Sequence, residues 1–136
     1  MDWPRSFEYA SWIVEAREKN SPYRIHGSVP NRSRGGGALI SNLPHDGVVE
    51  VACVVDRNGV TPIVFGRLPT QMAALCAAHM YVYDLGAQAA IERDLELATR
   101  ALLLDPLTAA VCTPAEIRAM ARELFEAERE FLPGYR

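Results

Sequence analysis

The first part of the chain has a helical pattern of apolar residues, which is followed by an irregular polar stretch. Residues 6–18 place apolar side chains at roughly helical spacing behind Ser6, a favourable N-cap residue, so the sequence predicts a first helix there. Residues 20–37 hold three arginines, no acid and a run of three glycines, which predicts a mobile basic loop. Two short apolar pieces, 23–25 and 38–40, are candidate strands.

A strand pattern follows at residues 47–66. Valines and Cys53 recur at every second position, and β-branched residues dominate, so a β-strand is predicted. Asn58-Gly59 then favours a tight turn, because both residues tolerate positive φ. The second strand contains Pro62, which indicates a sheet edge or a bulge. Together these signals predict a β-hairpin.

Everything after Pro69 has a helical pattern. Residues 70–83 are apolar on nearly all sides, which is typical of a helix buried in its own core or against another subunit. Gly86 is expected to mark a bend or junction, and 87–104 the next helix, with Ile91 on its apolar stripe.

Two further helices carry N-terminal signals. Asp105-Pro106 predicts a short helix to 111, and the capping box that begins at Thr113 predicts a last helix over 114–131. The predicted fold class is therefore α+β, a small antiparallel hairpin-based sheet packed with several helices.

Composition narrows the picture. The 136 residues fit a single domain, 1–136, and a net charge of −3 gives no electrostatic reason to expect nucleic acid or an anionic membrane as partner. Residues 72–91 are too polar for a membrane span. Three widely spaced cysteines suit no disulfide framework, so a reducing, cytoplasmic setting is predicted.

Two groups of residues are candidates for binding a phosphate or a metal, and each also has a purely structural interpretation. The loop 32–37, with Arg32 and Arg34, could cradle a phosphate, but it matches no phosphate-binding motif and a flexible connector is favoured. Cys76 and His79 share a helix face and could bind a metal, but a packed core cysteine and a satisfied histidine are favoured.

Asp46 and Glu50 are acids at or near the start of the predicted strand. His45 and Asp46 are neighbours in an extended segment, so their side chains should point apart rather than form an acid–base pair. Glu50 lies within the predicted strand and faces solvent if only one side of the sheet is covered. If both sides are covered, it needs a partner and could face a site.

An ordered set of motifs resembles a known family. Its members are NLPHD at 42–46, VVEVACVVDRNG at 48–59, LPTQ at 68–71, LDPLTAAV at 104–111 and ELFEA at 123–127. In this order and spacing they resemble the C-terminal domain of the family-four glycoside hydrolases, the NAD- and metal-dependent alpha-galactosidase and alpha-glucosidase group. The resemblance implies a domain like the C-terminal domain of lactate dehydrogenase, which covers the substrate and contributes to an oligomer interface.

The resemblance also implies a reaction. In that family NAD⁺ takes a hydride from C3 of the sugar, a tyrosine removes the C2 proton, and a divalent metal, usually manganese, polarises the neighbouring oxygens. This chain has no glycine-rich dinucleotide motif and lacks the family's metal-binding segment, so neither NAD nor Mn²⁺ is expected in it, and no catalytic residue. The tyrosine base is expected upstream of the matched residues, and Tyr9, which falls within the matched helix, is not assigned this role. Asn42, Glu50 and Gln71 are the predicted substrate-binding positions.

Three hypotheses follow. The first is a fragment or truncated homologue of such a glycosidase, hydrolysing O-glycosidic bonds and inactive alone. The second is a stand-alone oligomerisation or interaction module, with a homo-oligomer formed through the apolar helix 70–83. The third is a chain that binds a sugar or phosphate ligand by itself, through Arg32, Arg34 and the Asn42 segment.

Overall fold

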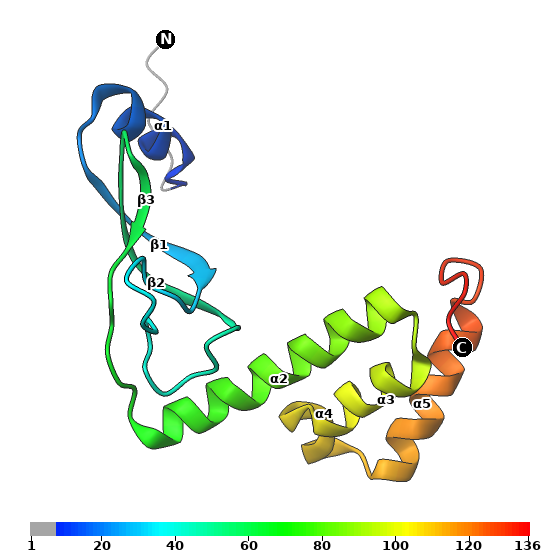
Figure 1. Cartoon of the computed structure of the whole chain (residues 1–136). Coiled ribbons are helices and arrows are strands. Elements are labelled where there is room, and N and C mark those ends of the chain that lie inside the picture. Colours follow the sequence, from blue (N-terminus) through cyan, green and yellow to red (C-terminus); the bar gives the residue numbers. More distant parts are fainter. Residues whose placement is uncertain (1–7) are drawn as a thin grey trace. The chain divides into compact units, whose positions relative to one another are not determined.

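The computed structural model describes residues 8–136 of the chain (Figure 1). They fall into two compact units: the first, here called the sheet unit, ends at Leu68, and the second, the helical unit, comprises Pro69–Arg136. The predicted N-cap Ser6 lies outside the described residues. Whether both units belong to one domain, 1–136, stays a prediction.

The sheet unit holds one helix and a three-stranded antiparallel sheet. Its elements are α1 (Ala10–Lys19), β1 (Tyr23–Pro30), β2 (Val48–Asp56) and β3 (Gly59–Pro62), and the strand order is β1-β2-β3. The predicted hairpin is confirmed as β2 and β3. Pro62 lies on an edge strand, where a missing N–H leaves no gap in the sheet.

The candidate strand at 23–25 is confirmed, but the strand continues to Pro30, so the interpretation of residues 20–37 as a loop is wrong for 26–30. β1 occupies Tyr23–Pro30 and pairs with β2 along its whole length, from Tyr23 opposite Val55 to Pro30 opposite Val48. Glycine suits position 27 of this strand, because a β-carbon there would come within 3.3 Å of the Cys53 sulfur, which is a tight contact. The candidate strand at 38–40 is reduced to a single bridge between Ile40 and Gly66.

The core of the sheet unit lies on one face of β2. Alternate residues of this strand are buried, and the apolar side chains of the loop after β1 join them: Val49, Val51, Cys53, Val55, Leu39, Ile40 and Leu43. Helix α1 packs against β2 and β1, and Trp12 stacks on Tyr23 with ring centroids 5.6 Å apart. The sheet is therefore one-sided, as the period-2 pattern allows.

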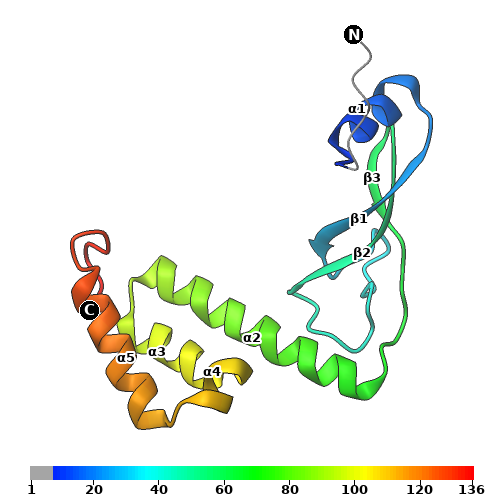
Figure 2. The same cartoon turned by 180° about the vertical axis from the view of Figure 1, so that it is seen from behind.

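The helical unit comprises α2 (Thr70–Glu92), α3 (Leu95–Leu104), α4 (Pro106–Val111) and α5 (Pro114–Ala127). Helix α3 contacts each of the other three, and Figure 2 shows it lying between α2 and α5. Over the described residues the chain thus has the predicted α+β class. No helix among these residues has both the length and the apolar character needed to cross a membrane.

Two helix boundaries differ from the prediction. Gly86 neither bends nor ends its helix, because one glycine costs only about 1 kcal/mol and its neighbours favour helix. The predicted helix 87–104 is instead broken at Arg93, which adopts a left-handed conformation with φ 55°, and Asp94 caps α3 by accepting a hydrogen bond from Leu97 N. Ile91, predicted on an apolar stripe, is 82% exposed.

The C-terminal elements follow their capping signals closely. Helix α4 is confirmed, with the Asp105 carboxylate accepting from Thr108 N, and Thr113 forms the predicted capping box with Glu116 at the start of α5. That helix ends at Ala127 instead of 131. The chain then turns back, and Arg136 exchanges main-chain hydrogen bonds with Arg93 and Leu95.

Candidate functional site

A buried asparagine organises the loop between β1 and β2. Asn31 is completely buried, and its Nδ2 lies 3.0 Å from the carbonyl oxygen of Ile40, 3.3 Å from that of Leu43 and 3.1 Å from that of Pro44. Its Oδ1 accepts from Ile40 N at 2.8 Å. One side chain therefore satisfies the main chain at both ends of the segment 40–44, which we call the clamped segment.

The basic tip of the same loop is also internally bonded. Ser33 N donates to the Gly37 carbonyl at 2.6 Å, His45 Nε2 lies 3.3 Å from the Gly36 carbonyl oxygen, and Arg32 forms an ion pair with Asp46. His45 and Asp46 thus have separate partners, as the sequence predicted. Because a carboxylate already faces Arg32, an anionic ligand there would have to compete with it, which favours the connector interpretation.

Asn42 makes a reciprocal pair of hydrogen bonds within the sheet unit. Its Nδ2 donates to the Leu68 carbonyl, and its Oδ1 accepts from Leu68 N, both at 2.9 Å. Next to it, Ser41 N donates to the Gly66 carbonyl at 2.7 Å. The clamped segment is therefore joined to residues 66–68, directly before α2.

The other two predicted substrate-binding residues are exposed. Glu50 lies on the uncovered face of β2, opposite Ser28 in the register, and Gln71 lies in the first turn of α2. Glu50 therefore has the solvent-facing position that a one-sided sheet predicts. The assignment of Asn42, Glu50 and Gln71 to a sugar-binding site stays a prediction.

Cys76 and His79 on α2 differ in their exposure to solvent. Cys76 is exposed, so the interpretation as a packed core cysteine is wrong, whereas His79 is half-buried with its ring 6.3 Å from that of Tyr83. Within residues 8–136, no group of three or more His, Cys, Asp or Glu side chains could hold a metal ion. These two residues therefore lack a third ligand in the described part of the chain.

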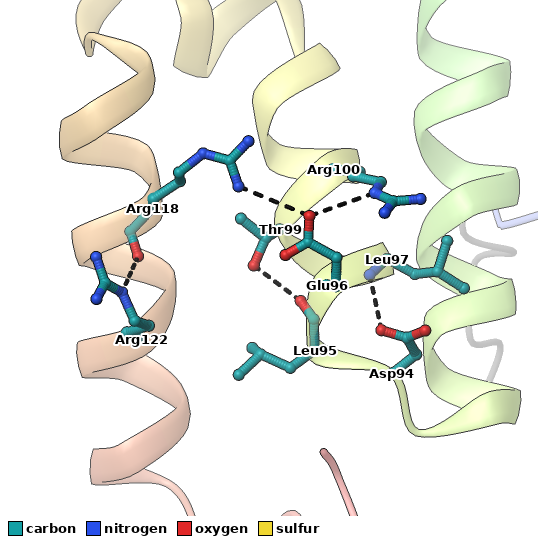
Figure 3. Close-up of polar contacts among 8 residues, drawn as sticks. All are labelled: Asp94, Leu95, Glu96, Leu97, Thr99, Arg100, Arg118 and Arg122. Carbon is teal, nitrogen blue, oxygen red and sulfur yellow. Dashed lines mark hydrogen bonds and ion pairs between the residues drawn. The ribbon is translucent and has the colours of Figure 1, made fainter.

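A charged cluster connects α3 to α5 (Figure 3). The Glu96 carboxylate lies 3.4 Å from Arg100 Nε and 3.7 Å from Arg118 Nη1, and Arg122 Nε donates to the Arg118 carbonyl at 3.2 Å. The paired side chains are about half exposed, so each ion pair contributes at most about 1 kcal/mol. This cluster has the character of a surface link between helices rather than of a reaction site.

Two helix-capping acids have shifted ionisation. Hydrogen bonds from the Thr108 hydroxyl and main chain lower the pKa of Asp105, with a smaller lowering from the nearby His79. Hydrogen bonds from the main chain and hydroxyl of Thr113 lower the pKa of Glu116. Both shifts come from helix caps, so they report structure and not catalysis.

An apolar groove of about 460 Å³ lies within the helical unit. Its lining is apolar apart from Asp105 and comprises Val82, Tyr83 and Gly86 of α2, Ala98, Ala101 and Leu102 of α3, Asp105, and Phe125 of α5. A β-carbon placed on Gly86 would meet no described atom within 4 Å beyond its chain neighbours and the adjacent backbone of its own helix, so packing within the described residues does not require glycine there. The groove offers contact area but few polar groups to orient a ligand.

The residue that sequence reasoning missed is Asn31. Its signal is weak, because an asparagine after Pro30 reads as an ordinary turn residue, and its burial depends on packing across the loop. The motif NLPHD overlaps the clamped segment and selected Asn42, but it leaves out Asn31, the buried residue that bonds to this segment.

Comparison with known proteins identifies the family. The model of the family 4 glycosyl hydrolase C-terminal domain matches residues 3–108, and the chain belongs to this family. It is 41% identical to an alpha-galactosidase of Bacillus subtilis (strain 168) over 97% of this chain and 29% of the relative. It is 39% identical to an alpha-galactosidase of Rhizobium meliloti (strain 1021), over 96% of this chain and 26% of that relative.

Solved structures agree on the fold. A 6-phospho-beta-glucosidase from Thermotoga maritima, with manganese, NAD⁺ and glucose-6-phosphate, has a TM-score of 0.75 at 25% identity, covering 89% of this chain and 28% of that one. A 6-phospho-alpha-glucosidase from gut microorganisms, with NAD and Mn²⁺, has a TM-score of 0.79 at 22% identity, covering 95% and 28%. The chain thus spans less than a third of the length of the relatives it matches.

Proposed function

We propose that the chain is the C-terminal part of an alpha-galactosidase-type glycosidase that needs NAD and Mn²⁺. The observation that carries the proposal is the match of nearly the whole chain to two alpha-galactosidases at 41% and 39% identity. Among relatives named for other sugars, an alpha-galacturonidase of Bacillus subtilis (strain 168) matches at 35% over 59% of this chain, and a "Probable 6-phospho-beta-glucosidase" of the same strain at 30% over 81%. An alpha-galactoside is therefore the favoured substrate.

The chemistry of NAD and manganese does not fit the residues of this chain. Its sequence contains no glycine-rich turn of the kind that holds a dinucleotide, and its described residues bring together no three metal-ligating side chains. We therefore assign no step of the reaction to residues of this chain. Its proposed part is to cover the sugar through the clamped segment and Glu50 of the sheet unit.

Calorimetry tests whether this chain itself binds either cofactor. Titration of the chain with NAD⁺ and, separately, with Mn²⁺ is expected to give no binding heat. Micromolar affinity for either would contradict the proposal, since the chain would then hold a cofactor itself. A full-length family 4 alpha-galactosidase titrated in parallel is the positive control.

A second candidate function is subunit assembly through α2. This helix carries Met72, Leu75, Tyr81 and Tyr83, each more than half exposed, and large exposed apolar surface marks interaction sites. On this proposal the chain forms a homo-oligomer through residues 70–83. A setting that keeps its three free cysteines reduced, such as the cytoplasm, is proposed for either function.

Sedimentation velocity at micromolar concentration separates the two functions. The assembly proposal expects a dimer or larger species that Leu75→Glu converts to monomer, because a charge in an apolar interface is costly. Val14→Glu is the matched control, since Val14 is similarly exposed but lies on α1. A monomer at all concentrations, or equal effects of both changes, would exclude α2 as the contact.

A further inference from the structure

The two asparagines of the loop after β1 are connected through the clamped segment. The side chain of Asn31 bonds to both main-chain groups of Ile40. Its Oδ1 accepts from Ile40 N at 2.8 Å, and its Nδ2 donates to the Ile40 carbonyl at 3.0 Å. Ile40 directly precedes Ser41 and Asn42, which bond to Gly66 and Leu68. The hydrogen bonds of Asn42 therefore depend on a main-chain conformation that Asn31 holds from the opposite side.

We propose that Asn31 is a positioning residue that fixes the clamped segment in the one conformation in which Asn42 reaches Leu68. The two asparagines then act as one clamp, although no hydrogen bond joins their side chains. This inference rests on the proposed function, in which the clamped segment lies near the substrate. The amide oxygen and nitrogen of Asn42 both form hydrogen bonds with Leu68. On this proposal Asn42 therefore affects sugar binding by fixing the position of the loop, and not by contacting the sugar through its amide group.

Burial supports a positioning role for Asn31. A buried amide that lost its partners would carry an unsatisfied polar group into the core, so the loop conformation that satisfies Asn31 is strongly preferred. Leu39, Ile40 and Leu43 are also buried, so the segment is held by apolar contacts as well. The apolar contacts hold the segment against the core, and the asparagine hydrogen bonds select its main-chain path.

Amide hydrogen exchange of the intact chain, followed by NMR, tests the clamp. Asn31→Ala is expected to speed exchange of the Leu68 amide by about tenfold or more, relative to amides in the β1–β2 ladder, because a distant partner of Leu68 is released. A role confined to general stability would speed the ladder and Leu68 amides equally. That equal response would overturn the proposal.

The matched control is Thr99→Ala. Thr99 is the other buried polar residue among those described, and its hydroxyl bonds to Leu95 of the same helix in the helical unit. This change should leave exchange at Leu68 within about twofold of the original. Because the experiment needs no sugar, NAD or metal, its failure would leave the proposed glycosidase function untouched, and failure of that function would leave the clamp untouched.

A reciprocal measurement covers the case in which Asn31→Ala does not fold. Coupling between two sites is reciprocal, so Asn42→Ala should speed exchange of the Ile40 amide, which donates to Asn31. Asn31→Asp keeps the acceptor for Ile40 N–H but removes the donor to three carbonyls, and should give the same selective effect at Leu68. Unchanged exchange at Ile40 in Asn42→Ala would show that the asparagines act independently.

Discussion

The two units of the chain bury different kinds of side chain. In the sheet unit the buried residues are mainly large aliphatic ones, together with Asn31. In the helical unit, Ile117 is the one large aliphatic side chain among the buried residues described, and the others are alanines and Thr99. Large apolar residues of that unit instead lie exposed, and they include Leu104, Leu107, Val111 and Phe131.

This difference determines how much of its stability each unit gains from its own apolar side chains. Burial of a leucine or valine stabilises a fold by about 1.5–3 kcal/mol, so the sheet unit gains most of its stability from its own side chains. Alanines at helix contacts allow close approach but bury little apolar area. The helical unit therefore leaves several large apolar side chains exposed, and such surface is typical of interaction sites.

The largest effect should come from the core of the sheet unit. Leu39→Ala removes a fully buried side chain and should lower the free energy of unfolding by about 2–5 kcal/mol. Leu107→Ala, at a position 73% exposed, should change it by less than about 0.5 kcal/mol. Urea unfolding followed by tryptophan fluorescence measures the first, since both tryptophans precede Leu68, and circular dichroism measures the second. Comparable losses would refute the contrast between the units.

Loss of the capping box should have an intermediate effect on the helical unit. Thr113→Ala removes the hydroxyl that accepts from Glu116 N, and should destabilise α5 by about 1 kcal/mol. Thermal unfolding followed by circular dichroism gives the value. Thr70→Ala is the control, because Thr70 follows the N-cap residue Pro69 and makes no cap. An equal loss in the control would mean that the box contributes nothing specific.

Acid should weaken the caps of α4 and α5 selectively. The folded-state pKa values of Asp105 and Glu116 lie below their ordinary values, so their stabilisation is fully present above the unfolded pKa values of about 4. It is lost as the pH falls through the lower folded values. Helical circular dichroism between pH 6 and pH 2.5 should therefore decline less in a variant carrying Asp105→Asn and Glu116→Gln. Identical acid profiles would contradict the assignment.

The smallest effect is expected at the exposed tip of the sheet unit. Asp46→Asn removes the ion pair with Arg32, in which both side chains are more than half exposed, and should cost at most about 1 kcal/mol. Raising the salt concentration should reduce even this difference. Urea unfolding at low and high salt checks both statements, and a loss above 2 kcal/mol would show that the loop tip depends on this pair.

Local signals in the sequence predicted the elements they govern directly. The Asp105-Pro106 start and the Thr113 capping box act over a few residues, and each is found where it was predicted. The turn of the hairpin is also found, but it lies at Arg57-Asn58, one residue before the predicted pair, and Gly59 alone of that pair has a positive φ. Pairing over longer distances overrode composition in β1, where a strand forms through Gly27 and ends at Pro30. Gly86 shows the reverse error, since a single glycine was too weak a signal to end a long helix.

The candidate site was predictable only where a family motif marked it. The motif NLPHD located the clamped segment, but the burial of Asn31 and the pairing of Asn42 with Leu68 depend on contacts between residues up to 26 positions apart. No periodicity in a single sequence encodes such contacts. The exposure of Cys76 was missed because small apolar neighbours on α2 suggested a core that the helical unit does not build around it.

Hydrolysis of an aryl alpha-galactoside is the measurement that tests the proposed function most directly. It compares the chain alone, in the presence of NAD⁺ and Mn²⁺, with the chain mixed with the N-terminal portion of a family 4 alpha-galactosidase, and that portion alone serves as control. We expect no hydrolysis by either part and restored hydrolysis by the mixture. Turnover by the chain alone would contradict the account, because its residues would then supply the cofactor chemistry that we assign elsewhere.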